Sequence, residues 1–98
     1  MYQIIFHPEA TNEFDDAFNW YKKESDDIAN RFKESILSQI YIVQNNPELF
    51  QRRRDGFRES VVHDFPYIVV YKVSKKLNAV TISAIFHTSR NPRKKYRH

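Results

Sequence analysis

The chain has 98 residues, of which 41% are hydrophobic and 15% aromatic, and it contains no cysteine. This length suits a single domain, residues 1–98, and the lack of cysteine excludes a disulfide framework, a thiolate nucleophile and the common cysteine zinc sites. No apolar run approaches the about 20 residues that span a bilayer, and the N-terminus lacks the basic region of a signal peptide. We therefore expect a cytoplasmic protein that makes no membrane contact.

The formal net charge of +4 is divided unevenly along the chain. Residues 1–48 carry four bases against nine acids, a net charge of −5, whereas residues 49–98 carry twelve bases against three acids, a net charge of +9. Such a division indicates either a surface for an anionic partner or simply acidic helices beside a basic sheet.

The first half of the chain predicts one strand and two helices. Residues 2–6 are β-prone. Apolar side chains then recur at helical spacing over 10–21 and again over 28–43. A polar break at 22–27 separates the two stretches, and a serine or aspartate within it can cap the second helix. Two helices joined so closely are expected to form an antiparallel hairpin.

The second half predicts a meander of three strands. A basic connector, 49–56, ends in Asp-Gly, which is a strong turn signal. Strands are expected at 57–62, 67–74 and 79–87, followed by a basic tail. The order β-α-α-β-β-β predicts an α+β fold in which the helical hairpin packs on a mostly antiparallel four-stranded sheet.

Four short motifs follow one another along the chain: HPEA at 7–10, NPELF at 46–50, FPYIVVY at 65–71 and FHTSRNP at 86–92. Together they resemble the RelE/ParE superfamily, the toxins of bacterial type II toxin–antitoxin modules, and most closely its ParE-like plasmid-stabilisation branch. The resemblance implies a small basic toxin that inhibits growth and is neutralised by a cognate antitoxin. It also implies a RelE/ParE-like sheet with the helical hairpin on one face and a concave basic face opposite.

The superfamily divides into two activities, so the resemblance implies two possible targets. RelE-like members cleave mRNA in the ribosome, whereas ParE-like members inhibit DNA gyrase. In the first case the chain would be a metal-independent endoribonuclease. Arg58 and Arg90 would then stabilise charge on the phosphate, His87 would act as acid or base, and Tyr96 would stand where RelE-like toxins often carry a tyrosine.

The basic connector departs from the RelE-like pattern. RelE-like toxins place lysines there, whereas this chain has three arginines, which stay protonated and are poor general bases. Catalysis would then rest on His87 or His63. In either branch, the side chains expected to contact a nucleic acid or another target are Arg52, Arg53, Arg54, Arg93, Lys94 and Lys95.

Several of these residues also have a structural interpretation. His87 at a strand end can serve as a hydrogen-bonding residue, and Tyr67 and Tyr71 are expected to pack in the core. Trp20 lies beside the apolar stripe, where it either covers the core edge or contacts a partner. The acidic helix face is expected to be solvent surface. The acids and histidines lack metal-ligand spacing, and no cofactor is expected.

Two further interpretations of the function stay open. The first is a binding module that kept the fold and lost the toxic activity, which the missing lysines would explain. The second is an autonomous nucleic-acid binder, whose affinity would fall steeply as salt rises.

Overall fold

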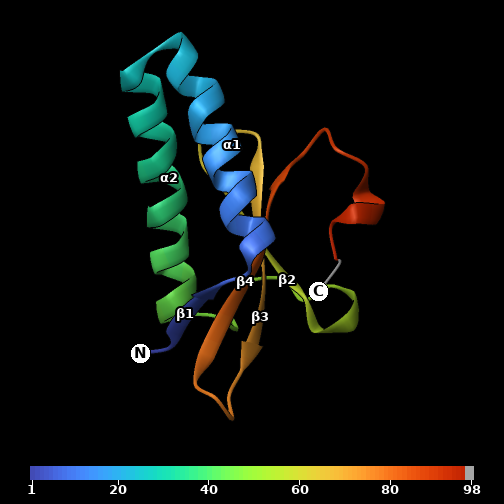
Figure 1. Ribbon diagram of the computed structural model, residues 1–98. Helices are drawn as coiled ribbons and strands as arrows, with labels where there is room; N and C mark the ends of the chain where they lie inside the picture. The colour runs from blue at the N-terminus through green and yellow to red at the C-terminus, as the bar shows by residue number, and fades with distance from the viewer. Residues whose placement is uncertain (97–98) are drawn as a thin grey trace.

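The computed structural model describes residues 1–96, so that Arg97 and His98 of the predicted tail lie outside the described residues. The elements follow the predicted order β-α-α-β-β-β (Figure 1). The strands and helices are β1 Gln3–Phe6, α1 Pro8–Glu24, α2 Asp26–Asn45, β2 Arg58–Val61, β3 Tyr67–Ser74 and β4 Ala79–His87. Two short 3-10 helices, η1 Arg54–Gly56 and η2 Pro92–Lys94, precede β2 and follow β4.

The break between the helices is shorter than the predicted 22–27, because only Ser25 leaves the helical conformation. Its backbone is extended, with φ −169° and ψ 134°, and its Oγ accepts hydrogen bonds from the N–H groups of Asp27 and Ile28 at 3.1 and 3.3 Å. The residues before it stay in α1, and the Ser25 N–H closes that helix on the Tyr21 carbonyl at 3.0 Å. A serine N-cap thus ends one helix and begins the next.

The four strands form one sheet in the order β1-β4-β3-β2, in which β1 pairs parallel with β4 and the other neighbours are antiparallel. This arrangement confirms the predicted mostly antiparallel sheet. Strand β1 pairs only with residues 79–82 of β4. The second half of β4, residues 83–87, therefore has β3 on one side and no strand on the other within the part of the chain described.

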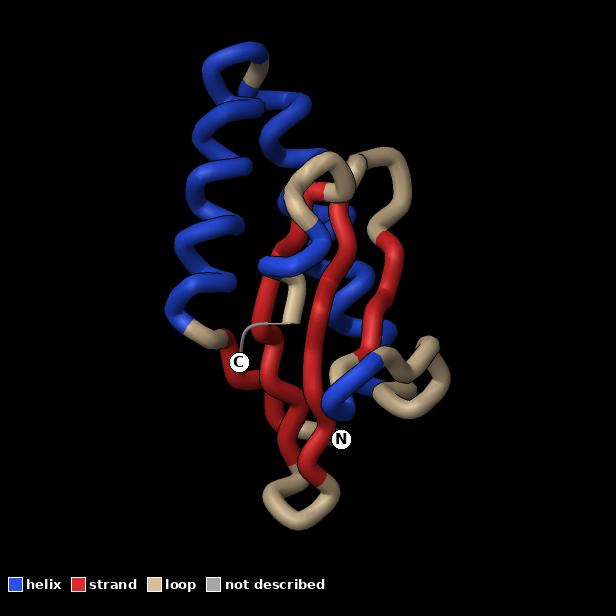
Figure 2. Tube along the Cα trace, turned by 90° about the vertical axis from the view of Figure 1, so that its right-hand side faces the viewer, coloured by secondary structure: helices blue, strands red, loops and turns tan. Residues whose placement is uncertain are grey.

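The sheet has a helix-covered face and an outer face (Figures 1 and 2). Between the helices and the sheet lies the main core, which includes Phe32, Ile36 and Tyr71. The outer face carries a smaller apolar cluster of Phe57, Val70, Ala84 and Phe86, against which the side chain of Tyr96 packs. The predicted core positions of Tyr67 and Tyr71 are confirmed, since both side chains are buried.

A β-bulge interrupts the pairing of β3 with β4. Val70 pairs with Ala84 and Tyr71 with Ile82, which leaves Ser83 without a partner in the register. The extra residue places Ile82 and Ile85 in the main core and Ala84 in the outer cluster. The bulge therefore keeps both apolar sides of β4 filled.

No helix in residues 1–96 is long and apolar enough to cross a membrane.

Candidate functional site

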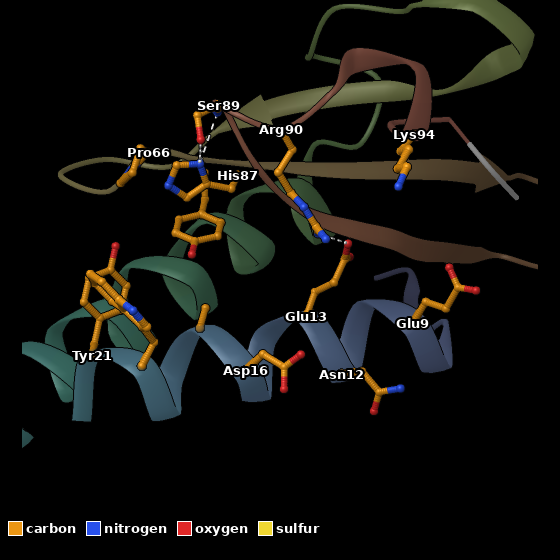
Figure 3. Close-up of a pocket in the computed structure, with 13 residues that line it drawn as sticks. Glu9, Asn12, Glu13, Asp16, Tyr21, Pro66, His87, Ser89, Arg90 and Lys94 are labelled. Atoms are coloured by element: carbon orange, nitrogen blue, oxygen red, sulfur yellow. Dashed lines mark hydrogen bonds and ion pairs between the residues drawn. The ribbon is translucent and has the colours of Figure 1, made fainter. Parts of the chain in front are cut away.

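A groove of about 850 Å³ runs between α1 and the end of β4, at the place where β4 has no strand neighbour (Figure 3). One wall comes from α1 and carries Glu9, Asp16 and Trp20, and the opposite wall carries His87, Arg90 and Lys94. We call this the α1–β4 groove. One of its walls bears carboxylates and the other bears cations, so the groove joins the acidic half of the chain to the basic half.

Glu13 ties the two walls of the α1–β4 groove together. Its Oε1 accepts a hydrogen bond from the Ile85 N–H at 3.0 Å, and its Oε2 binds the Arg90 guanidinium at 3.2 Å. The Glu13 side chain is only 13% exposed. A carboxylate from α1 thus takes the position on β4 that a neighbouring strand would hold.

The expectation that the acidic helix face is plain solvent surface is wrong at Glu13. A signal was present in the sequence, because Glu13 lies at helical spacing between the buried Ala10 and Ala17. An acid on the apolar stripe of a helix needs a polar partner when the helix packs.

His87 is held within its own turn. Its Nδ1 accepts the Ser89 N–H at 3.1 Å and lies 2.7 Å from the Ser89 Oγ (Figure 3). Its ring meets the Tyr67 ring edge-on at 5.0 Å. A nitrogen that accepts a backbone N–H carries no proton, so the neutral ring holds its proton on Nε2. The ring nitrogen that could act as a base is thus already engaged.

Arg58 and Tyr71 anchor the connector between α2 and β2. The Arg58 guanidinium donates to the carbonyls of Phe50 and Glu48 at 2.8 and 3.3 Å, and the Tyr71 hydroxyl donates to the Pro47 carbonyl at 2.6 Å. Arg58 pairs with Tyr71 in the sheet, whereas His87 pairs with Tyr67, four residues earlier in β3 and on the opposite neighbouring strand. Arg58 therefore lies apart from His87.

Tyr96 belongs to a third place, on the outer face of the sheet. Its ring stacks on Phe57 at 5.3 Å, and its hydroxyl donates to the carboxylate of Glu59. The Glu59 Oε2 also lies 3.4 Å from the Lys95 Nζ and 3.6 Å from the Arg53 Nε. We call Glu59 with Arg53, Lys95 and Tyr96 the tail clamp. Burial and the hydrogen bond to Glu59 raise the pKa of Tyr96 to about 12.

The tail clamp engages part of the basic set that the sequence assigned to target contacts. Besides Arg53 and Lys95, the Arg54 guanidinium lies 5.8 Å from the centre of the Tyr96 ring. Arg52 and Arg93 are exposed, and Lys94 lines the α1–β4 groove. The sequence carries no signal for the role of Glu59, because its partners come from the connector and from Lys95 and Tyr96, which are distant in the chain.

The candidate catalytic residues therefore lie in three separate places. His87 and Arg90 line the α1–β4 groove, Arg58 supports the connector, and Tyr96 closes the tail clamp. His63 lines a different hollow, beside α2. In the described residues no three His, Asp or Glu side chains lie close enough to hold a metal ion. Which of the basic residues contact a target stays a prediction.

Comparison with known proteins identifies one family. The sequence model described as ParE toxin of type II toxin-antitoxin system, parDE, matches residues 4–92. No curated protein matches the chain. Among solved structures, a chain of the chromosomal ParDE TA system from P. aeruginosa is similar, with a TM-score of 0.77 and 17% sequence identity, over 91% of this chain and 98% of that chain. At this identity the structural likeness confirms the fold alone.

Proposed function

Because the chain belongs to the ParE toxin family of type II toxin–antitoxin systems, we propose that it is a growth-inhibiting toxin that acts in the cytoplasm, that a cognate antitoxin neutralises it, and that its target is DNA gyrase. RelE-like cleavage of mRNA on the ribosome is the competing activity. A binding module that kept the fold and lost the toxic activity is the third possibility.

The separation of the candidate catalytic residues supports gyrase inhibition over mRNA cleavage. Attack by a 2′-hydroxyl needs a base, an acid and a cation around one phosphate group. Here Arg58 is bound to carbonyls of the connector, Tyr96 lies on the outer face, and the Nδ1 of His87 is engaged by Ser89. These three side chains would have to leave their present partners and move together before they could act on one bond.

The α1–β4 groove offers a surface suited to a protein partner. Trp20 is 61% exposed at its rim, and its ring meets the Tyr21 ring edge-on at 5.1 Å. Exposed tryptophan is enriched among the residues that dominate protein interfaces. This exposure favours a partner contact for Trp20 over a position at the core edge.

Induction of the chain alone, with paired readouts, tests the proposal. We expect growth arrest in a bacterial host, loss of supercoiling when the purified chain is added to gyrase, and no cuts by primer extension on translated mRNA. Co-expression of a small acidic protein encoded beside this gene should restore growth.

Matched variants locate the contact. Trp20→Ala should weaken gyrase inhibition at least about tenfold, as truncation of an interface hot spot does, whereas Leu77→Ala should leave it unchanged. Leu77 is the control because it is also large and exposed, at 69%, but lies in the β3–β4 turn.

Two results would contradict gyrase inhibition. Ribosome-dependent cuts that disappear in His87→Ala and Arg90→Ala, while both variants keep the Tm of the original chain, would establish a nuclease. Normal growth at good soluble expression would instead favour the binding module without toxicity.

A further inference from the structure

Ser83, the extra residue of the bulge, has a buried hydroxyl with no partner. The residue is 1% exposed, and its Oγ makes no hydrogen bond with any group in residues 1–96. A buried hydroxyl without a partner destabilises the fold, so each such case calls for an explanation. Bulges are frequent beside functional sites, where they re-aim a side chain.

The Ser83 side chain lines a hollow of about 400 Å³ near the β3–β4 turn. The other residues around it are Lys72, Val73, Ser74 and Thr81, and we call the hollow the Lys72 pocket. Lys72 pairs with Thr81 in the sheet register, so the ammonium group and the hydroxyls come from two neighbouring strands. The Ser74 hydroxyl accepts the Leu77 N–H at 3.2 Å and keeps its own proton to donate.

Among residues 1–96, no carboxylate lines the Lys72 pocket. Lys72 makes no ion pair within the described residues, and its Nζ lies 4.3 Å from the centre of the Phe57 ring. Two nearby acids are bound by other cations: Glu48 pairs with Lys75 at 3.3 Å, and Glu59 is held in the tail clamp. The residues that line the pocket therefore carry one ammonium group and three hydroxyls, and no acid stands among those of the described chain.

We propose that the Lys72 pocket binds a phosphoryl group. Lysine ammonium groups and serine or threonine hydroxyls are common donors to phosphate oxygens, and several of them can serve one tetrahedral anion. The Ser83 hydroxyl has no exposed surface in the unbound chain, and it gains its missing partner once the side chains around the hollow rotate to admit the anion. The pocket shares no lining residue with the α1–β4 groove or the tail clamp, so the proposal does not depend on the toxin's target.

The test is an NMR titration of the full chain with inorganic phosphate, at an ionic strength held constant with chloride. The backbone amide signals of Lys72, Thr81 and Ser83 should shift saturably, with a Kd in the millimolar range. Lys72→Gln should weaken binding at least about tenfold, whereas Lys76→Gln should change it less than about twofold. Lys76 is the matched control because it is exposed in the turn of the same hairpin.

Ser83→Ala separates binding from a structural role. If the hydroxyl serves the anion, this variant should weaken phosphate binding severalfold while its Tm stays the same or rises, since no hydrogen bond within the protein is lost. A parallel titration with the dinucleotide d(TpT) distinguishes the source of the phosphoryl group. Tighter binding of d(TpT) than of inorganic phosphate indicates a nucleic-acid backbone, and the reverse order indicates free phosphate or a monoester.

Three outcomes would overturn the proposal. Shifts with phosphate no larger than those with chloride would mean that the pocket does not bind phosphate. Equal weakening by Lys72→Gln and Lys76→Gln would mean that only the general charge of the surface acts. A Ser83→Ala variant that binds phosphate as before but unfolds at a clearly lower temperature would give the hydroxyl a structural role instead.

Discussion

Two glutamates join parts of this chain that are far apart in the sequence. Glu13 binds the Ile85 N–H and Arg90, and Glu59 binds Lys95 and Tyr96. Each side chain is largely withdrawn from water, at 13% and 7% exposure. A carboxylate that is withdrawn from water is stable only when cations and hydrogen-bond donors surround it. Each glutamate therefore requires such groups from distant parts of the chain to pack against it.

Glu59→Ala should therefore loosen the end of the chain. Removal of one member of a largely buried ion pair leaves its partners without compensation, and here Arg53 and Lys95 are still partly hydrated. We expect the free energy of unfolding in urea to fall by about 2–3 kcal/mol. Glu48→Ala, which breaks the exposed pair with Lys75, should change it by less than about 0.5 kcal/mol. Equal stability of the two variants would rule out a stabilising role for the tail clamp.

The second half of strand β4 has an unpaired edge, because β1 no longer pairs with it there. An unpaired strand edge can pair with another copy of the chain. Helix α1 covers this edge, and Glu13 binds the N–H of Ile85. The helical hairpin thus protects the sheet as well as burying its core.

Glu13→Ala should expose this edge. We expect a loss of about 1–3 kcal/mol in unfolding free energy, because the Ile85 N–H loses its partner, together with concentration-dependent self-association seen by light scattering. Glu13→Gln keeps an oxygen for the Ile85 N–H and loses the charge facing Arg90, so its stability should be intermediate. Asp15→Ala, on the exposed side of α1, is the control. A monomeric Glu13→Ala of unchanged stability would contradict this role.

The buried Tyr67 and Tyr71 in the main core and the partly buried Tyr96 on the outer face link the stability of the entire fold to alkaline pH. Burial is the main cause that raises the pKa of Tyr67, Tyr71 and Tyr96 to about 12, from an ordinary value of 10.0. The folded chain therefore keeps protons that the unfolded chain releases above pH 10. Stability is fully present below pH 10 and is lost as the pH rises from 10 towards 12.

Urea unfolding at pH 8, 10 and 11 should show this decline. The slope should reach about 1 kcal/mol per pH unit for each of the two buried groups, Tyr67 and Tyr71, and tyrosinate absorbance should rise together with unfolding. Tyr96→Phe keeps the ring stacked on Phe57 and removes one titrating group, so its decline should be shallower. A stability that does not change between pH 8 and 11 would contradict the argument.

Much of the fold could be predicted from the sequence, because helical and strand periodicity are local properties. The helices, the strands and their order agree with the prediction, apart from the helix break, where Ser25 alone suffices. The sheet order and the bulge at Ser83 were not predictable in this way. They depend on which strands pair and in what register, and the apolar run of β4 is compatible with more than one register.

The sequence by itself determined the family, the α+β architecture and the kinds of side chain available for function. It also showed that the +9 charge of the second half sets it apart from the first. Only the folded arrangement showed that His87, Arg58 and Tyr96 lie in three places, and that Glu59 draws Arg53 and Lys95 inward. The reason is physical: charge and residue type belong to single positions, whereas a site depends on long-range contacts that bring distant positions together.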